Sequence, residues 1–242
     1  MTGNISLNEK GKMTGSDISF VFPMFNESLN IEETLQKTSE LAREICDSYE
    51  IVVADDASTD ASAEIVGRLA SRDERIKLIR LEKNTKFGGA LREGLKAASK
   101  DIVLYTDADF PAKVEDVKRA LTLLDGADVV TAYSLVLKDE SVKRIIMSKV
   151  YNFLVQFLFG LNIRDINSGL KIYKRKALEG LRLRSKSPFI DVEIFAELAK
   201  RDCRIREYGL VFDLRTRGAS NISKPSIVAQ TFWDMLVYKF SG

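Results

Sequence analysis

Short apolar runs alternate with amphipathic stretches along most of this chain. The runs are rich in β-branched and aromatic side chains and are bounded by polar residues, which is typical of buried strands. The stretches between them carry apolar residues at helical spacing. The predicted strands are residues 18–22, 50–54, 75–81, 102–105 and 127–133. The predicted helices are residues 29–46, a helix from about 60 to 70, one ending near 99, and residues 114–124. This alternation predicts an α/β fold, a mostly parallel sheet with helices on both faces.

Acidic and amide side chains follow three of the predicted strands, at the point where each strand ends. They are Asn26 and Glu27, Asp55 and Asp56, and Asp107 and Asp109. Binding sites in open parallel sheets lie outside the carboxyl ends of the strands, so we expect these clusters to meet at one edge. Helix capping is the simpler explanation for a single cluster, and we favour it for Asp60. It explains convergence of all three clusters poorly.

Asp107 and Asp109 are separated by one residue, so on an extended backbone both carboxylates point the same way. Two like charges held that close are costly unless a cation neutralises them. Mg²⁺ and Mn²⁺ take oxygen ligands and often bind one or two carboxylates together with substrate phosphates. Taken alone, the motif more often caps a following helix, here near Lys113. The other acidic clusters favour a metal site.

Composition removes several classes of chemistry. The chain has no histidine, which excludes Ser-His-Asp and Cys-His nucleophilic systems and histidine-ligated zinc. With 37 basic and 35 acidic residues, the net charge of +2 gives no argument for nucleic acid as a partner. Cys46 and Cys203 are isolated and lack metal spacing. No phosphate-binding loop or dinucleotide fingerprint is present, so the acidic edge best suits a sugar nucleotide held through a metal.

The chain is long enough for one large α/β domain. We interpret residues 1–16 as a flexible polar tail and 17–242 as one catalytic domain. Within it, residues 17–134 would bind a nucleotide sugar and 135–242 would face an acceptor and a membrane. No run reaches the length of a transmembrane helix; residues 145–161 come nearest and are interrupted by Lys149, Asn152 and Gln156. Residues 145–161 and 227–240 are predicted as amphipathic helices that lie either at a membrane surface or against a protein core.

The first half of the chain resembles the family 2 inverting glycosyltransferases. Residues 21–27 (VFPMFNE) resemble the family's V-x-P-x-Y-N-E, and residues 52–60 (VVADDASTD) resemble V-V-D-D-G-S-T-D. Residues 84–94 (NTKFGGALREG) are similar to N-x-G-x-G-A-A-x-x-x-G, and residues 107–109 match the metal-binding D-A-D. The resemblance implies a GT-A-type, Rossmann-like fold.

The second half resembles the polyprenyl-phosphate (dolichyl-phosphate) mannosyl- and glucosyltransferases of that family. Residues 165–173 (DINSGLKIY) are similar to D-x-x-S-G-F-R-x-Y, and residues 215–220 (RTRGAS) to R-x-x-G-x-S. Residues 189–193 (FIDVE) and 205–207 (IRE) resemble F-x-x-E and the start of I-x-E-V-P. The resemblance extends from residue 18 to about 222.

Several positions depart from the family pattern. Ala57 replaces a glycine, and Phe87 interrupts the glycine spacing. Lys171 replaces an arginine, which keeps the charge but loses the forked geometry that grips a phosphate with two hydrogen bonds. Asn221 stands where a lysine usually follows the serine. Phe110 and Pro111 follow the D-A-D motif in place of the common leucine and polar residue.

The resemblance implies inverting transfer of a hexose from a GDP- or UDP-sugar to a polyprenyl or dolichyl phosphate. Mg²⁺ or Mn²⁺ on Asp107 and Asp109 would stabilise the leaving diphosphate. Asp165 would position or activate the acceptor; its structural alternative is a loop cap beside Ser168. The catalytic residues implied are Asp109 and Asp165. Those implied for the nucleotide sugar are Pro23, Asn26, Glu27, Asp56, Lys86 and Asp107. Those implied for lipid or donor phosphates are Arg144, Lys171, Arg215 and Ser220; the three basic side chains are equally well explained as solvated surface residues.

The lipid acceptor implies a protein of the cytoplasm, attached peripherally to the cytoplasmic face of a membrane. Two other functions remain open from the sequence. In the first, the chain is a glycosyltransferase whose acceptor is a glycolipid or a growing polysaccharide. In the second, it is an inactive member of the family that binds a membrane or a partner. A receiver domain and a haloacid-dehalogenase-type phosphatase fit poorly, because the chain is too long for the first and Phe110 and Pro111 contradict the second.

Overall fold

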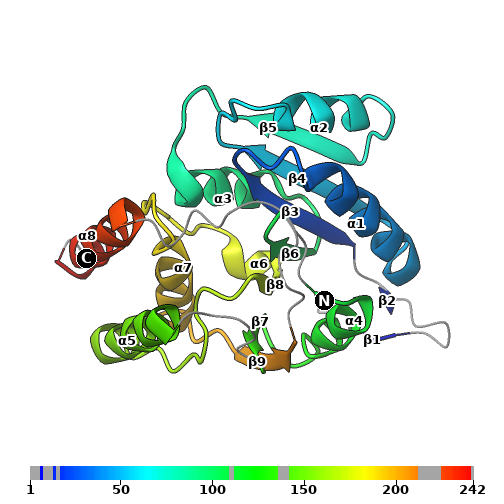
Figure 1. Cartoon of the computed structure of the whole chain (residues 1–242). Helices are drawn as coiled ribbons and strands as arrows, with labels where there is room; N and C mark the ends of the chain where they lie inside the picture. Colours follow the sequence, from blue (N-terminus) through cyan, green and yellow to red (C-terminus); the bar gives the residue numbers. More distant parts are fainter. Residues whose placement is uncertain are drawn as a thin grey trace.

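One central sheet organises the computed structural model (Figure 1). The structure describes residues 6–7, 13–14, 17–108, 112–135, 142–211 and 225–240, with the backbone alone at 6–7, 13–14, 142–146 and 225. The strands of the sheet are β3 (Ile18–Met24), β4 (Tyr49–Asp55), β5 (Ile76–Arg80), β6 (Ile102–Thr106), β7 (Val129–Ser134), β8 (Leu170–Lys174) and β9 (Ile205–Leu210). Their order is β5-β4-β3-β6-β8-β7-β9. β8 is antiparallel to both of its neighbours, and the remaining neighbouring pairs are parallel.

Helices cover both faces of this sheet, as predicted. They are α1 (Ile31–Ile45), α2 (Ser62–Ala70), α3 (Lys86–Ala97), α4 (Val114–Thr122), α5 (Val142–Phe159), α6 (Arg175–Leu178), α7 (Ile190–Ala199) and α8 (Pro225–Phe240). Buried side chains of α1, α2 and α4 form one apolar cluster with the sheet. Those of α3, α5, α7 and α8 form a second cluster on the other face. The predicted mostly parallel α/β architecture is confirmed.

The central strands are hydrophobic on both sides because each face is covered. In β3, Phe20 and Phe22 belong to the first cluster and Val21 to the second, and all three are fully buried. Side chains that alternate between two buried faces produce a continuous apolar run instead of an alternation of apolar and polar residues. This is why the strands could be located from their runs.

Three details differ from the sequence-based expectation. β3 continues through Pro23 to Met24, beyond the predicted end at residue 22. Proline is tolerated there because the ladder to β6 ends at Val21, so no strand on that side needs an N–H from residue 23. Residues 6–7 (β1) and 13–14 (β2) form a short antiparallel pair inside the stretch predicted as a tail. β8 and β9, which we had recognised only as motifs, are strands of the sheet.

β8 also joins the two halves predicted for the domain. It comes from residues after 134, yet it lies between β6 and β7, which come from residues before 135. Both halves therefore contribute to one continuous sheet. None of the helices among the described residues is long and apolar enough to cross a bilayer.

Candidate active site

The predicted convergence of polar strand ends is confirmed by the topology. β4, β3 and β6 are neighbours and run parallel, so their carboxyl ends lie at the same edge. Asn26 and Glu27 follow β3, Asp56 follows β4, and Asp107 follows β6. We call this edge the acidic edge.

The reversed strand β8 brings a further acidic loop to the acidic edge. Its first residue, Leu170, pairs with Thr106 at the last position of β6. The Thr106 hydroxyl also donates a 2.7 Å hydrogen bond to the carbonyl of Gly169. Because β8 is antiparallel to β6, the residues that precede it, including Asp165, approach the edge where β6 ends. Parallel pairing would have placed them at the opposite edge.

The turn after β3 is held against the loop after β4 through Asn26. Its backbone N–H donates to the Ser58 hydroxyl at 2.9 Å, and its side-chain oxygen accepts from the Thr59 N–H at 2.8 Å. Asn26 has a φ of +57°, a left-handed conformation that asparagine tolerates better than most residues. An asparagine thus suits this turn for local reasons as well as for any contact with a ligand.

Glu27 occupies the next position of the same turn. Its backbone N–H donates to the Ser62 hydroxyl at 2.8 Å, and its carboxylate accepts from the Asn30 side-chain amide at 2.9 Å. Asp60 accepts hydrogen bonds from the N–H groups of Ser62 and Ser28, which agrees with its predicted role at the start of α2. Burial alone would raise the pKa of Asp60, but the bonds from Ser62 and Ser28 outweigh it and lower the pKa.

Asp56 links β4 to the start of α3. Its side chain is buried, and one carboxylate oxygen accepts the Thr85 N–H at 2.5 Å and the Thr85 hydroxyl at 2.9 Å. The Asn84 side chain donates to the Asp56 carbonyl at 3.1 Å. Burial raises the pKa of Asp56, although the bonds from Thr85 and the nearby Lys86 act in the other direction. Asp56 and Lys86, two of the residues that the resemblance implies for the nucleotide sugar, therefore lie close together.

Two residues near Asp56 stand in left-handed conformations where the family has glycine. Ala57 has a φ of +57° and Lys86 a φ of +68°. Lys86, directly before Phe87, stands at the third position of the N-x-G-x-G pattern, where the family has its first glycine. Glycine adopts this conformation without the steric cost that a Cβ brings, so both positions carry backbone strain.

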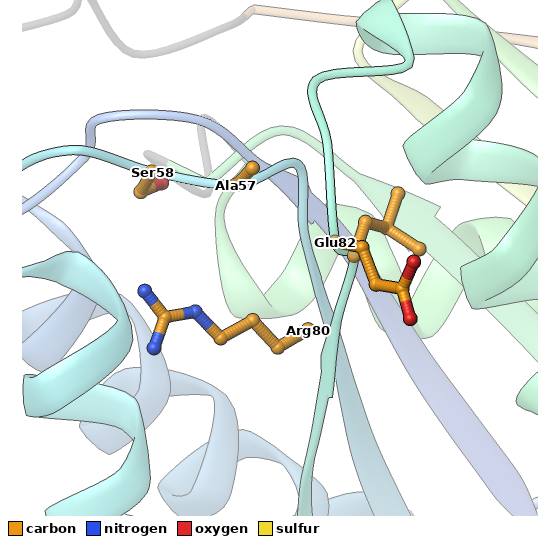
Figure 2. Close-up of a pocket in the computed structure, with 5 residues that line it drawn as sticks. Ala57, Ser58, Arg80 and Glu82 are labelled. Atoms are coloured by element: carbon orange, nitrogen blue, oxygen red, sulfur yellow. The ribbon is translucent and has the colours of Figure 1, made fainter.

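A shallow pocket of about 350 Å³ adjoins Asp56 at the ends of β4 and β5. It is lined by Ala57, Ser58, Arg80, Leu81 and Glu82. Figure 2 shows the Arg80 side chain extending beneath Ser58, while Glu82 points away from it. The Arg80 guanidinium lies 3.6 Å from the fully buried Asp55 carboxylate, an ionic contact too long for a hydrogen bond.

Asp107 is the half-buried residue directly after β6. The carbonyl of the next residue, Ala108, accepts a 2.6 Å hydrogen bond from Thr34 of α1, which fixes the start of this loop. Asp109 lies outside the described residues. No cluster of three or more acidic, cysteine or histidine side chains suited to a metal occurs among the described residues. Asp107 offers one carboxylate, which fits Mg²⁺ or Mn²⁺ because these ions commonly bind one or two carboxylates and complete the shell with waters and substrate phosphates.

The loop that carries Asp165 is fixed to α5 and β9. The Asn152 side chain of α5 donates to the Arg164 carbonyl at 3.1 Å, and the Arg164 N–H donates to the Glu207 carboxylate at 2.7 Å. The Arg164 guanidinium stacks over the Tyr133 ring at 4.5 Å. Asp165 is half-buried, and its carbonyl accepts the Ser168 N–H at 3.3 Å. The loop-capping contact beside Ser168 is thus present in the backbone.

The structure does not support the predicted phosphate contact of Lys171. Its side chain is fully buried, and the ammonium lies 3.2 Å from Asp191 and 2.6 Å from the Ser168 carbonyl, to which it donates. An ammonium so enclosed is not presented to a phosphate at the surface. The cause is the position of Lys171 in the middle of the sheet, where its side chain lies under α7 between Asp191 and the Tyr105 ring of β6.

The remaining predicted phosphate-binding residues are not placed. Arg144 lies in α5 with its side chain undescribed, and Arg215 and Ser220 lie outside the described residues. Their roles stay predictions.

Sequence reasoning missed the role of α7 in holding the site together. Glu193 is buried, and its two carboxylate oxygens accept the N–H groups of Arg184 and Ser185 at 2.8 and 2.9 Å. The Lys186 carbonyl in that loop accepts the Gly88 N–H of α3 at 2.8 Å. A Cβ on Gly88 would lie 2.5 Å from the Ser185 carbonyl, so only glycine fits this contact. Residues 189–193 (FIDVE), which the sequence analysis identified only as a motif, thus brace the start of α3.

Helices α5 and α8 present an apolar surface beside the Asp165 loop. They lie next to each other in Figure 1, and Lys239 of α8 donates to the Leu158 carbonyl of α5 at 2.7 Å. Their inner sides bury Val155 and Met235. Their exposed apolar side chains, which we call the α5–α8 surface, are Met147, Val150, Phe153, Phe157, Phe232, Trp233, Leu236, Val237 and Phe240. Both predicted helices are confirmed, and each keeps an apolar stripe in solvent.

Comparison with known proteins decides the family. Residues 19–182 match the model described as Glycosyl transferase family 2. This chain belongs to glycosyl transferase family 2. The acidic edge is therefore the candidate active site of a family 2 glycosyltransferase.

Two relatives illustrate the range of proteins to which the chain is similar. Glycosyltransferase AglD of Haloferax volcanii is 27% identical over 239 residues, which cover 92% of this chain and 38% of that protein. Undecaprenyl-phosphate 4-deoxy-4-formamido-L-arabinose transferase of Pseudomonas aeruginosa is 30% identical over 192 residues, covering 78% of this chain and 56% of that enzyme. The chain thus spans roughly two fifths to three fifths of the length of these relatives.

Solved structures agree with the fold. Glucosyl-3-phosphoglycerate synthase of Mycobacterium tuberculosis, in complex with phosphoglyceric acid, has a TM-score of 0.70 at 21% identity, covering 94% of this chain and 81% of that one. The same enzyme in complex with Mn²⁺, uridine-diphosphate and glucosyl-3-phosphoglycerate gives a TM-score of 0.68 at 20% identity, covering 94% and 81%. The predicted GT-A-type fold is confirmed.

Proposed function

We propose that this glycosyltransferase moves a hexose, with inversion, from a GDP- or UDP-sugar to a polyprenyl or dolichyl phosphate at a membrane surface. The observation that carries the proposal is the reversal of β8. It brings the Asp165 loop to the edge where Asn26, Glu27, Asp56 and Asp107 follow the ends of β3, β4 and β6. One edge would then hold a donor on one side and an acceptor on the other. The name of the undecaprenyl-phosphate relative supports an acceptor of this class.

The donor would lie over the ends of β3, β4 and β6. Asp56 is a buried carboxylate at the end of β4 and suits hydrogen bonds from a base or ribose. Pro23, Asn26 and Glu27 would form the adjoining wall, and Lys86 would face the diphosphate. Mg²⁺ or Mn²⁺ held by Asp107 and Asp109 would supply positive charge for the leaving diphosphate.

The acceptor would approach from the side of Asp165. A lipid phosphate is already ionised at neutral pH, so its oxygen needs orientation more than deprotonation. Asp165 would orient it or accept its remaining proton, with Arg144, Arg215 and Ser220 as proposed phosphate contacts. The Asn152–Arg164 hydrogen bond connects the Asp165 loop to α5.

The α5–α8 surface would hold the protein at the cytoplasmic face of the membrane. Phe157, Trp233 and Phe240 are 76%, 64% and 82% exposed, which is unusual for large apolar side chains on one side of a molecule. Aromatic side chains favour the boundary between headgroups and acyl chains. A membrane there would present its lipid phosphates next to the Asp165 loop.

Transfer of radiolabelled hexose to a short polyprenyl phosphate tests this proposal. UDP- and GDP-linked glucose and mannose are each supplied with Mn²⁺, and the same polyprenol without phosphate is the control acceptor. We expect one donor to label the phosphorylated lipid only, with an inverted anomeric linkage. Asp165→Asn should reduce kcat by about 100-fold, in the range of a lost proton-transfer group.

Two outcomes would contradict different parts of this proposal. Labelling of a glycolipid or polysaccharide but not of polyprenyl phosphate would contradict the proposed acceptor and favour the other transferase. Metal-dependent donor binding without transfer to any acceptor would favour a non-catalytic, membrane-binding role.

A further inference from the structure

A buried ion pair lies directly behind the acidic edge. Lys171 of β8 and Asp191 of α7 are 0% and 2% exposed, and their charged atoms are 3.2 Å apart. The Lys171 ammonium also lies 5.0 Å from the centre of the Tyr105 ring. Removing two charges from water is costly, so a buried pair is weak evidence for a purely stabilising role. The contacts of the pair indicate what else it does.

Lys171 reaches the loop of Asp165 from inside the protein. Its ammonium donates a 2.6 Å hydrogen bond to the Ser168 carbonyl. Ser168 in turn donates its N–H to the Asp165 carbonyl at 3.3 Å, closing the turn that presents Asp165. The hydroxyl of Thr106 holds the neighbouring Gly169 carbonyl at 2.7 Å. The inner side of the loop is therefore fixed by one charged and one neutral donor.

Asp191 supplies the charge that keeps Lys171 in this place. It stands in the first turn of α7, where the helix dipole favours a carboxylate. One of its oxygens, Oδ1, is buried without a well-aligned hydrogen bond, so its contact with Lys171 is mainly ionic. Two residues later, Glu193 fixes the 184–186 loop that meets α3. The start of α7 thus braces both the acceptor side and the donor side of the edge.

We propose that Lys171 and Asp191 are positioning residues, which hold the Asp165 turn at the distance from the β6 end that sugar transfer requires. The inference rests on the proposed function, because it concerns the placement of Asp165 in that site. Neither residue touches a substrate. Their loss should slow the transfer step and leave the donor site intact.

Four variants separate positioning from general stability. Asp191→Asn keeps the shape and removes the counter-charge. The double variant Lys171→Met, Asp191→Leu replaces both charged side chains by apolar ones, which are tolerated in a buried site. It leaves no donor for the Ser168 carbonyl. Lys171→Arg keeps a charged donor at this position and introduces the arginine of the family pattern. Glu197→Gln is the control: Glu197 is a partly exposed residue of the same helix, it pairs with Lys200 at the helix end, and a glutamine there can still accept the Tyr238 hydroxyl.

Steady-state kinetics with the donor and acceptor identified for the wild type is the first readout. We expect kcat to fall by about 100-fold in Asp191→Asn and in the double variant, with the donor KM within twofold, because small misplacements of reacting groups cost that much. Lys171→Arg and Glu197→Gln should stay within a few-fold of wild type. A folded double variant with wild-type kcat would overturn the inference.

Hydrogen exchange of the backbone is the second readout and needs no activity. We expect faster exchange at residues 164–170 in Asp191→Asn and the double variant, with α1 and β4 unchanged. If wild type transfers no sugar, the proposed function fails and this exchange pattern alone decides the inference. Unchanged exchange at residues 164–170 in folded Asp191→Asn and double variants would overturn the inference. Faster exchange in those variants, with wild-type protection kept in Lys171→Arg, would support it.

Discussion

At the scale of single residues, the loop after β4 carries a strained alanine. Ala57 has a φ of +57° and lines the pocket beside Asp56. A left-handed non-glycine residue costs roughly 1–2 kcal/mol, while glycine costs about 0.5–1 kcal/mol more entropy on folding. Ala57→Gly should therefore raise the free energy of unfolding by about 0.5–1 kcal/mol, measured by urea denaturation. Ala97→Gly, at the last residue of α3, has no left-handed strain to relieve and should not raise it. A loss of stability in Ala57→Gly would contradict the strain.

Glu50 of β4 is a buried carboxylate surrounded by several hydrogen-bond donors. It accepts from Ser19, Lys77 and Ser99, each at 2.6 Å in its shortest contact. Burial alone would raise the pKa of Glu50, but the bonds from Lys77, Ser19 and Ser99 lower it from 4.5 to about 2. A depressed pKa contributes stability above the unfolded value, and that stability is lost as the pH falls through about 2.

Glu50→Gln should lower the free energy of unfolding at pH 7 by about 3 kcal/mol. The difference from wild type should shrink between pH 4.5 and 2 in denaturation measured across that range. Glu44→Gln removes the exposed partner of Lys118 and should cost less than about 1 kcal/mol at pH 7. Equal losses in the two variants, or a difference independent of pH, would refute this account.

The residues of the candidate site differ in whether the sequence alone could place them. Asn26, Glu27, Asp56 and Asp107 could be assigned to one edge because each directly follows an apolar run. The role of Lys171 could not, since a lysine in a short strand gives no sign of whether its side chain is covered. Its partner Asp191 is 20 residues further along, and only the packing of α7 against the sheet brings them together.

At the scale of elements, two glycines inside helices make opposite demands. A Cβ on Gly94 of α3 would lie 2.7 Å from Val21 and 3.4 Å from Ala54, so α3 rests on the sheet through this gap. A Cβ on Gly67 of α2 would meet nothing within 4 Å. Gly94 is thus required by packing, whereas Gly67 only weakens its helix.

The matched variants test that difference. Gly94→Ala should lower the free energy of unfolding by about 1–2 kcal/mol, because overpacking outweighs the gain in helix propensity. Gly67→Ala should raise it by about 1 kcal/mol. Chemical denaturation of both variants beside wild type decides the matter; stabilisation by Gly94→Ala would show that α3 can move off the sheet at no cost.

The central strands and the helices α1 to α5 and α8 were predictable as elements, whereas α6, α7 and the strands β8 and β9 were not. β3, β4 and β6 are buried on both faces and appear as unbroken apolar runs. β8 and β9 (LKIYK and IREYGL) contain charged residues and lack such runs. The direction of β8 also depends on the path of the chain through α5. No local pattern specifies that path.

At the scale of the whole molecule, the insertion of β8 between β6 and β7 places the proposed donor and acceptor sites on one sheet. The neighbouring strands β4, β3 and β6 carry most of the proposed donor residues at their carboxyl ends. The reversed strand adds the Asp165 loop, and α5 with α8 adds an apolar surface beside that loop. Since all of them share one sheet and one core face, we expect donor, acceptor and membrane sites to be held rigidly relative to one another.

The central claim is that the acidic edge binds a nucleotide sugar through a metal. Thermal stability with GDP, UDP and their mannose and glucose forms, with and without Mn²⁺, tests it most directly. Asp107→Asn removes a proposed ligand, and Asp125→Asn changes an exposed aspartate in the turn before β7, at the opposite edge of the sheet. A ligand at 100 times its Kd should add about 2.7 kcal/mol of stability. We expect one nucleotide to stabilise wild type and Asp125→Asn only when Mn²⁺ is present, and not to stabilise Asp107→Asn. No shift with any nucleotide in wild type, or an undiminished shift in Asp107→Asn, would contradict the account.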